Sequence, residues 1–371
     1  MSVGPISPVA SLAVASAASA PRATSDVAAV AAQLVAEVTA TLTEDLPSTL
    51  PTAPPPSAVS AMVNQAAMQQ DSLAPLLADL AVAVNSPAMP PDARATAAQI
   101  LAVQAPLNAD VTGPQLQAAT QISGVFLEAS LAAAVVNGEA AAPAGVQQDL
   151  KALLLQLTSE LAPLVQAPTP AKTAGPTTAP RGVAVRGSSE LLEPPVGGGA
   201  TTGQAAARPS LDPQSRADVL VRTLQQEAQG ALARVQLSQA ASVERSGETT
   251  RWMFEVPIAT PGGVGVAQFE ISRDGHGPGA GSAAEPSWRA RFSINAAPSG
   301  PVHADVLLGK DRARVTLMAE DGAAQAALAA HQDELTQALA AEQGPDVAVR
   351  VIAGAPPRPQ QPAGQLVDRR S

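Results

Sequence analysis

The side chains able to do chemistry are few and scattered along this chain. It has no cysteine, which excludes disulfides and thiolate sites, and its three histidines show no metal-ligand spacing. His276 falls in a glycine-rich loop, His303 on a predicted strand and His331 on a predicted helix. We expect two of these histidines at the surface and His331 half-buried beside the leucines of its helix. No catalytic residue, cofactor site or metal site is predicted.

Four carboxylates lie close together in the sequence, as a paired acid-base site would require: Asp305, Asp311, Glu320 and Asp321. The predicted elements separate them. Asp305 falls on a strand face, Asp311 in a turn and Asp321 at a helix cap, so each of these three has an ordinary structural role. We therefore do not expect an enzyme.

Two pairs of arginines are the more interesting pattern. Arg289 and Arg291 alternate on one predicted strand, and Arg312 and Arg314 alternate on another. If these strands pair, four guanidinium groups share one side of a sheet and offer a docking surface to an acidic partner. The alternative is a solvated strand face that protects the sheet against edge pairing.

The overall charge and hydropathy exclude several classes of protein. The net charge is −10 and no basic block occurs, which argues against nucleic-acid binding. No uninterrupted apolar run is long enough to span a membrane, so no membrane insertion is predicted. Residues 1–24 begin with small residues like those of a signal peptide. They have no basic residue before Arg22, and Pro5 and Pro8 interrupt them, so we expect a disordered leader, with a cleaved signal as the alternative.

Residues 25–162 form an alanine-rich region whose apolar residues follow helical periodicity. Alanine lines most helix faces and buries little area, so we expect a loose bundle of marginal stability. Residues 163–213 are rich in proline and glycine with few large apolar residues, and we expect them to form a linker. Helices are predicted at 25–47, 58–70, 73–85, 91–104, 113–136 and 146–162.

Residues 214–354 change character. A helix is predicted from about Ser215 to near Gly247, and the apolar period then switches to two. A helix between Asp321 and Gly344 precedes a last strand. Strands are predicted at 252–258, 267–271, 289–295, 302–308, 312–319 and 347–351.

Five of the six aromatic residues lie on the first three of these strands, where we expect them to form the core: Trp252, Phe254, Phe269, Trp288 and Phe292. The fold class is therefore an α+β C-terminal domain, an antiparallel sheet covered on one face by helix. It follows a mostly helical, Ala/Pro-rich, partly disordered N-terminal region. Residues 355–371 are expected to be a disordered tail.

The order of several sequence words resembles the flagellar hook-length control protein family. The words of the C-terminal part are Trp252–Ile258, Val266–Asp274, Trp288 and Gly300–Leu308. Three words upstream are similar to segments of longer family members: Ser123–Ala129, Asp149–Leu155 and Ala231–Gln239. The family turn usually reads Pro, two residues, Leu-Gly, one residue, Val. Here Gly300 and Val302 match it, and Ser299 stands where leucine is expected.

The resemblance implies a non-enzymatic regulator of flagellar assembly that is made in the cytoplasm and exported through the flagellar type III apparatus. Its N-terminal part would be a molecular ruler that touches hook and hook-cap subunits. Its C-terminal domain would engage the cytoplasmic domain of the export-gate switch protein and switch export from hook to filament substrates, acting as a monomer. The matching Gly300 and Val302, with the four arginines, are the candidate partner-binding residues. A secreted structural or adhesive surface protein with an Ala/Pro-rich stalk remains the alternative.

Overall fold

The structure is a computed structural model that describes residues 56–106, 113–137, 144–166, 193–242, 250–260, 262–274, 287–295, 299–310, 312–343 and 346–357. The leader 1–24, the helix expected at 25–47, His276 and residues 358–371 lie outside this described part.

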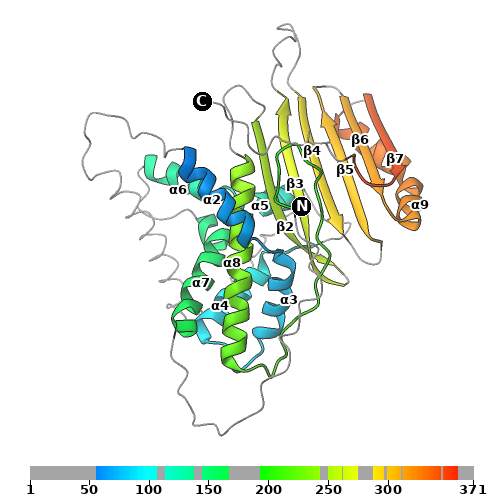
Figure 1. Cartoon of the computed structure of the whole chain (residues 1–371). Helices are drawn as coiled ribbons and strands as arrows, with labels where there is room; N and C mark the ends of the chain where they lie inside the picture. Colours follow the sequence, from blue (N-terminus) through cyan, green and yellow to red (C-terminus); the bar gives the residue numbers. More distant parts are fainter. Residues whose placement is uncertain are drawn as a thin grey trace, which may run out of the picture.

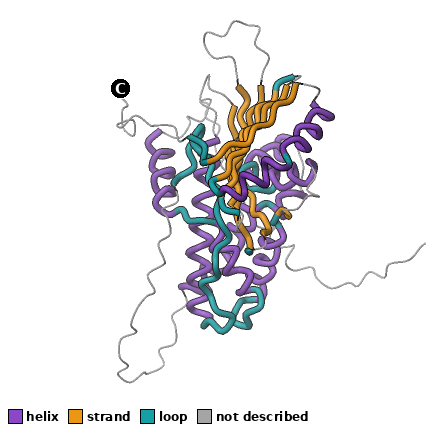
Figure 2. The backbone as a smooth tube through the Cα atoms, turned by 90° about the vertical axis from the view of Figure 1, so that its right-hand side faces the viewer, coloured by secondary structure: helices purple, strands orange, loops and turns teal. Residues whose placement is uncertain are grey.

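The described chain forms a helical layer packed against one end of a twisted sheet (Figures 1 and 2). The helices of the N-terminal half are α2 Pro56–Gln69, α3 Leu73–Ala83, α4 Pro91–Ala102, α5 Gly113–Gln121, α6 Leu127–Val136, the 3-10 helix η1 Ala144–Gln148 and α7 Leu150–Gln166. The later helices are α8 Ala217–Ser242, α9 Gly322–Ala330 and α10 Gln332–Gln343. The strands are β1 Ala105–Pro106, β2 Thr250–Thr260, β3 Gly263–Asp274, β4 Ser287–Asn295, β5 Pro301–Leu308, β6 Arg312–Ala319 and β7 Asp346–Ala353.

The sheet follows the chain order, β1-β2-β3-β4-β5-β6-β7. Neighbours from β2 to β6 are antiparallel, and β1 and β7 each add in parallel at an edge. A parallel β6–β7 pair requires a crossover connection, which α9 and α10 provide. The predicted α+β fold class and its six long strands are confirmed.

Alternation along the strands gives the sheet two chemically different faces. One face, here called the aromatic face, carries Phe254, Phe269 and Phe292 at directly opposed positions of β2, β3 and β4. Their rings stack at centroid distances of 5.2 and 5.4 Å. The other face, here called the polar face, carries a cross-strand row of Glu270, Arg291, Asp305, Thr316 and Arg350.

Helices cover parts of both faces, so the expectation of one covered face is wrong. Ala119 of α5 packs against Phe254 on the aromatic face, and α9 and α10 lie behind β6 and β7 on that same side (Figure 1). Arg234 of α8 meets Glu255 on the polar side of β2. Both faces of β2 are consequently buried, unlike the half-buried strand that its alternation predicted.

Four of the five clustered aromatic residues are at least half-buried, but Trp288 is 39% exposed. Trp288 lies next to the first residue of β4, at the end of the sheet, where it stacks on Trp252 and carries the guanidinium of Arg273 over its ring. The prediction that all five belong to the core is therefore wrong for Trp288.

The largest core lies in the helical layer and not beneath the aromatic residues. Leucines of α3, α7 and α8 fill it: Leu76, Leu77, Leu80, Leu153, Leu154, Leu157, Leu220 and Leu224. Val266 of β3 belongs to the same buried cluster, so the helical layer and the sheet share one core. The expectation of a loose, alanine-lined bundle is wrong because these leucines face one another while alanines fill the narrow contacts between helices.

Part of the expected linker is packed onto the structure. Residues 163–166 belong to α7, and residues 193–211, here called the strap, run along the polar side of the sheet and the helical layer. Gln204 exchanges backbone hydrogen bonds of 2.8 and 3.0 Å with Val266. Asp79 of α3 accepts hydrogen bonds from the backbone N–H groups of Ser210 and Leu211. These contacts offset the entropy that a proline- and glycine-rich segment loses on ordering. Residues 167–192 of the expected linker lie outside the described part.

A buried ion pair joins the helical layer, the strap and the sheet. The Arg234 guanidinium, 2% exposed, donates to Oε1 of Glu255 on β2 at 2.9 Å. It also donates to Oε1 of Gln70 at 2.8 Å and to the carbonyl of Glu193 at 2.6 Å. Gln204 of the strap donates to the same Glu255 carboxylate. Three separate segments thus depend on one charged side chain.

Arg234→Met is expected to lower the free energy of unfolding by about 3–5 kcal/mol, because it leaves the Glu255 carboxylate buried without its counter-charge. Urea denaturation of the full chain measures this loss. The matched control is Arg216→Met, one residue before the start of α8, whose ion pair with Asp218 is exposed and should contribute less than about 0.5 kcal/mol. Equal stability of the two variants would contradict the role of the buried pair.

Asp149 caps the start of α7 with a buried carboxylate. Its Oδ1 accepts from the backbone N–H groups of Lys151 and Ala152 at 2.9 and 3.2 Å. Burial raises the pKa of this carboxyl group from 3.8 to about 6, with a smaller contribution from the nearby Glu128. The folded state therefore holds the proton more tightly than the unfolded chain does.

Because the folded pKa is raised, this group makes the protein lose stability as pH rises from about 4 to about 6. Asp149→Asn keeps the cap oxygen but does not ionise. We expect its stability relative to the native chain to increase between about pH 4 and about pH 7, by at most roughly 3 kcal/mol. Thermal unfolding of both proteins across this range tests the expectation, and a gap that does not change with pH would refute it.

Candidate functional site

The polar face of the sheet holds the predicted arginines, and a buried carboxylate orders its inner part. Glu270 of β3 is 1% exposed. Arg291 donates to its Oε1 at 2.6 Å, Arg251 lies 3.2 Å from the same oxygen, and the strap's Gly198 N–H donates to Oε2. Arg291 is therefore neutralised inside the protein and helps to hold the strap.

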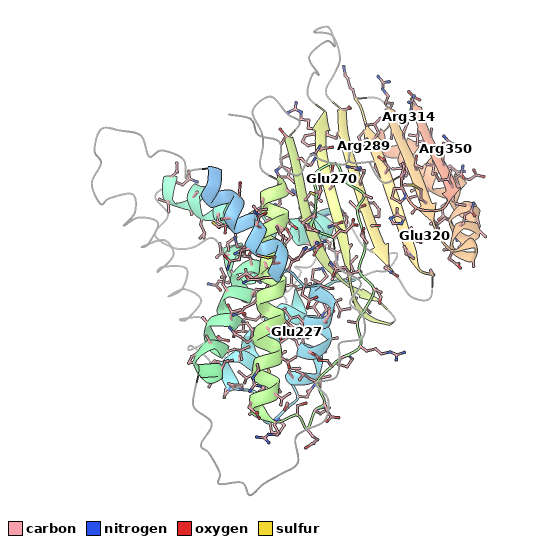
Figure 3. All side chains as sticks on the ribbon, in the orientation of Figure 1. Glu227, Glu270, Arg289, Arg314, Glu320 and Arg350 are labelled. Carbon is pink, nitrogen blue, oxygen red and sulfur yellow. The ribbon has the colours of Figure 1, made fainter. Side chains whose placement is uncertain are left out.

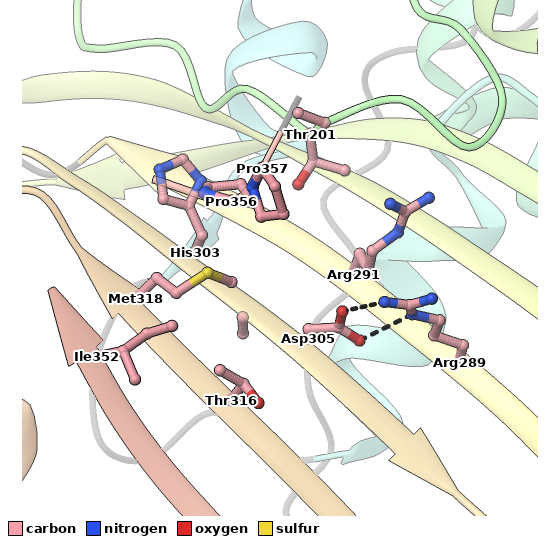
Figure 4. Close-up of a pocket in the computed structure, with 12 residues that line it drawn as sticks. Thr201, Arg289, Arg291, His303, Asp305, Thr316, Met318, Ile352, Pro356 and Pro357 are labelled. Carbon is pink, nitrogen blue, oxygen red and sulfur yellow. Dashed lines mark hydrogen bonds and ion pairs between the residues drawn. The ribbon is translucent and has the colours of Figure 1, made fainter. Parts of the chain in front are cut away.

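Arg289 lies two residues before Arg291 on the same strand, β4, and on the same face. Its Nε donates to Oδ1 of Asp305 on β5 at 2.9 Å, and its terminal Nη2 also contacts Oδ2, which makes a two-pronged ion pair (Figure 4). Asp305 thus pairs with a predicted binding residue instead of serving as an independent acid. The side chain of Arg289 remains 44% exposed.

Arg312 and Arg314 reach the same face from β6, although β5 separates β4 from β6, so the two arginine-bearing strands do not pair directly. The register places Leu307 opposite both Arg289 and Arg314. Arg314 is exposed and points outward beside Arg350 of β7 (Figure 3). Within the described ranges, no carboxylate bonds to Arg312, Arg314 or Arg350.

A pocket of about 220 Å³ lies between Arg289 and Arg291 of β4 and the end of the described chain. Thr201 of the strap and Pro356 and Pro357 after β7 stand over it, while Arg289 and Asp305 line its floor (Figure 4). The pocket is lined by the ion pair of Arg289 and Asp305 and by apolar atoms of Met318 and Ile352. It resembles a surface depression more than a catalytic cleft.

His303 is the buried histidine, which corrects the expectation for His331. His303 is 6% exposed and contacts the Ser293 hydroxyl through Nδ1 and Glu320 through Nε2, whereas the His331 side chain is 76% exposed. The Ser293–His303–Glu320 chain resembles a hydrolase triad, but Ser293 is 0% exposed and its hydroxyl cannot reach a substrate. Within the described ranges, no cluster of histidines and carboxylates has the composition of a metal site.

Gly300 and Val302 lie away from the arginines. Gly300 has a φ of +69° in the turn before β5, and Val302 pairs with Ile294 and Ala319 on the aromatic side of the sheet. Val302 and Leu307 are five residues apart on one strand, about 17 Å along it. The six predicted partner-binding residues therefore lie in two places: Gly300 and Val302 at the start of β5, and the four arginines on the polar face of β4 and β6. Their role in binding stays a prediction.

The three upstream sequence words meet in space, a feature that their separation in the sequence concealed. Lys151 of the second word contacts Glu128 of the first and donates to Gln239 of the third. The Gln239 amide donates to the carbonyls of Gly124 and Val125. Gly124 also ends the helix expected over 113–136, because its φ of +94° is left-handed.

Gly124→Ala is expected to cost more than about 1 kcal/mol of stability, because a Cβ there would lie 3.0 Å from the Cβ and backbone N of Lys151 at a left-handed φ. The control is Gly113→Ala, where nothing lies within 4 Å and where stability should change by less than about 0.5 kcal/mol. Denaturant titration of both proteins provides the comparison. Similar denaturation midpoints of the two variants would show that packing of the three words does not need the close approach of Gly124 to Lys151.

Three parts of the polar face were not predicted from the sequence to belong to the candidate site: Arg350, Glu270 and the strap. The alternation of Val347, Val349 and Val351 already placed Arg350 on a polar strand face. Glu270 likewise alternates with Phe269 and Ile271, but nothing local shows that it is buried. No sequence pattern indicated that a proline- and glycine-rich segment would lie along the sheet.

Comparison with known proteins identifies the C-terminal part. Residues 278–360 match the family model of the flagellar hook-length control protein FliK, which confirms the family resemblance for this segment. The matched segment contains β4 to β7 with α9 and α10, and therefore all of the predicted partner-binding residues. This family is regulatory and non-catalytic. Searches of curated proteins and of solved structures gave no significant match.

Proposed function

We propose that this protein controls flagellar hook length and switches type III export from hook to filament substrates. The observation that carries the proposal is the family match over residues 278–360, which coincides with the strands that carry Arg289, Arg291, Arg312 and Arg314. The cytoplasmic domain of the export-gate switch protein is the proposed partner of the C-terminal sheet, and the hook and hook-cap subunits are the proposed partners of the N-terminal part.

The charge distribution supports a docking role for the polar face. The whole chain carries a net charge of −10, yet the strands of this face carry more arginines than carboxylates whose side chains the structure describes. The arginines are Arg251, Arg289, Arg291, Arg312, Arg314 and Arg350, and the carboxylates are Glu255, which Arg234 of α8 pairs, Glu270, Asp305 and Asp346. A local positive field on an acidic protein favours one acidic partner and one orientation. Two exposed arginines, Arg314 and Arg350, lie at its outer side, away from the strap.

The core shared by the helical layer and the sheet limits how the N-terminal part could act as a ruler. Helices α3, α4 and α7 are packed with α8 in one core, so these helices cannot extend while this core is intact. Passage through a type III channel as an extended chain requires opening it, including the buried pair of Arg234 and Glu255. In this proposal the N-terminal part measures length as an unfolded chain and packs with the sheet in the folded protein. No helix in the described part of the chain is long and apolar enough to cross a membrane.

The proposal is tested in cells that lack the native protein and express either the full chain or a chain without residues 287–357. Loss of β4 to β7 is expected to give overlong hooks without filaments, because the proposed switch is absent. Electron microscopy of isolated hooks measures both features. Hooks of normal length bearing filaments would remove the proposal.

The docking face is tested separately by capture of the full chain on the cytoplasmic domain of the export-gate switch protein. Changing Arg289, Arg291, Arg312 and Arg314 together to serine is expected to weaken capture at least about tenfold. Arg216→Ser, just before α8 and away from the sheet, is the control for loss of an exposed arginine, and circular dichroism shows whether each variant is folded. Undiminished capture of the four-arginine variant would place the partner elsewhere.

A further inference from the structure

Strand β7 ends the sheet with an unpaired edge. Among the described strands, its only neighbour is β6. The N–H of Gly354 bonds to the carbonyl of Ala319, and in a parallel pair alternate residues direct both backbone groups to the same side. The even-numbered residues of β7 therefore bond to β6, and Val347, Val349, Val351 and Ala353 direct their N–H and C=O groups outward.

This edge carries the charged side chains of Asp346 and Arg350 but has no bulge and no proline, the features that block the backbone of a sheet edge. The strand pairs with β6 without interruption from Asp346 to Ala353, so it contains no bulge, and it has no proline. The Gln332 amide of α10 donates to the Val349 carbonyl at 3.0 Å and occupies one outward acceptor. The remaining outward groups form a template onto which an extended segment can add.

Two side chains beside this edge are positively charged and favour a segment with negative charges. Arg350 on β7 and Arg314 on β6 are both exposed, lie on the polar face and point away from the sheet (Figure 3). The register places Arg314 opposite Ala348 and Arg350 opposite Thr316, so the two arginines are diagonal neighbours. Asp346 stands opposite Arg312 and places a carboxylate beside that arginine.

We propose that the edge of β7 takes up an extended acidic segment of a partner protein as an additional strand. This inference rests on the proposed function, since it specifies how the sheet holds its partner. The backbone of the segment would bond to the outward groups of Val347, Val351 and Ala353. Its carboxylates, at alternate positions, would face Arg314 and Arg350.

The opposite side of the added strand needs different side chains. Val349 is buried and Val351 half-buried on the aromatic face, where α10 lies behind β7. Residues of the segment on that side should be small or apolar. The recognised pattern is therefore alternation of acidic and apolar residues over about the length of β7.

A second copy of this chain fits the edge less well. Two β7 strands paired edge to edge would bring two copies of the exposed Arg350 onto neighbouring strands, with Arg314 one strand further in on each side, and these like charges repel. An acidic segment brings the opposite charge to the same positions.

The test measures fluorescence anisotropy of a short labelled peptide in which glutamate and valine alternate, titrated with the full chain. The comparison peptide has the same sequence but is N-methylated at alternate residues, which keeps its charge and removes its strand hydrogen bonds. We expect the N-methylated peptide to bind at least about tenfold more weakly. Changing Arg314 and Arg350 together to serine should weaken binding of the unmodified peptide by a similar factor.

A matched pair of variants locates the binding edge. Val351→Pro removes an outward N–H at a position where proline is compatible with an edge strand, whereas Val351→Ala trims the side chain and keeps the N–H. Binding should be lost in the proline variant and kept in the alanine variant, with both folded by circular dichroism. Equal binding of the two peptides, or equal binding by the two variants, would overturn the inference and leave only a charge contact.

Two further results separate this inference from the proposed function. If the proline variant is still captured by the export-gate domain while the four-arginine variant is not, strand addition fails and the proposed function stands. If the peptide binds as expected but cells that express the chain without residues 287–357 make normal hooks with filaments, the proposed function fails. A dimer in sedimentation that the proline variant breaks would also overturn the inference, because a second copy would then occupy the edge.

Discussion

The buried ion pair between Arg234 and Glu255 is the constraint on which the arrangement of this protein depends. Both side chains are less than a tenth exposed, and a charge in such surroundings is costly unless it is paired and hydrogen-bonded. The guanidinium satisfies this condition by contacting the sheet, the loop before α3 and the start of the strap. Separating any of these segments leaves a buried polar group without its partner, so the helical layer, the strap and the sheet are expected to open together.

This coupling divides the polar face into an inner and an outer part. Toward β2 and β3, Glu270 neutralises Arg291 and fixes the strap, so these charges serve the fold. Toward β6 and β7, Arg314 and Arg350 project into solvent beside an open strand edge. The part of the sheet matched by the hook-length control family contains this outer region, and the internal charges keep the rest of the face closed. The inner charges are thus paired within the protein, whereas Arg314 and Arg350 of the outer part face solvent.

The strands could be predicted from sequence because their signal is local: Phe254, Phe269 and Phe292 alternate with polar neighbours at a period of two. The helical core could not, because Leu76, Leu153 and Leu224 come from helices far apart in the chain, and alanine between them dilutes the pattern. The sequence predicts a linker where the strap lies, because the acceptors that order the strap, such as Asp79 and Gln268, lie elsewhere in the sequence. For the candidate site, the sequence predicts the four arginines, but the pairing of Arg291 with Glu270 and of Arg289 with Asp305 depends on strand register, which composition does not contain.

The central claim is that the helical layer and the sheet form one cooperative unit, held by the buried pair, and not a ruler joined loosely to a switch. Amide hydrogen exchange of the full chain at increasing denaturant concentration tests it directly. The account predicts one opening free energy for the amides of α3, α7 and α8 and those of β2 and β3. Exchange of the helices at low denaturant, with β2 and β3 still protected, would contradict it and would show that the two layers fold independently.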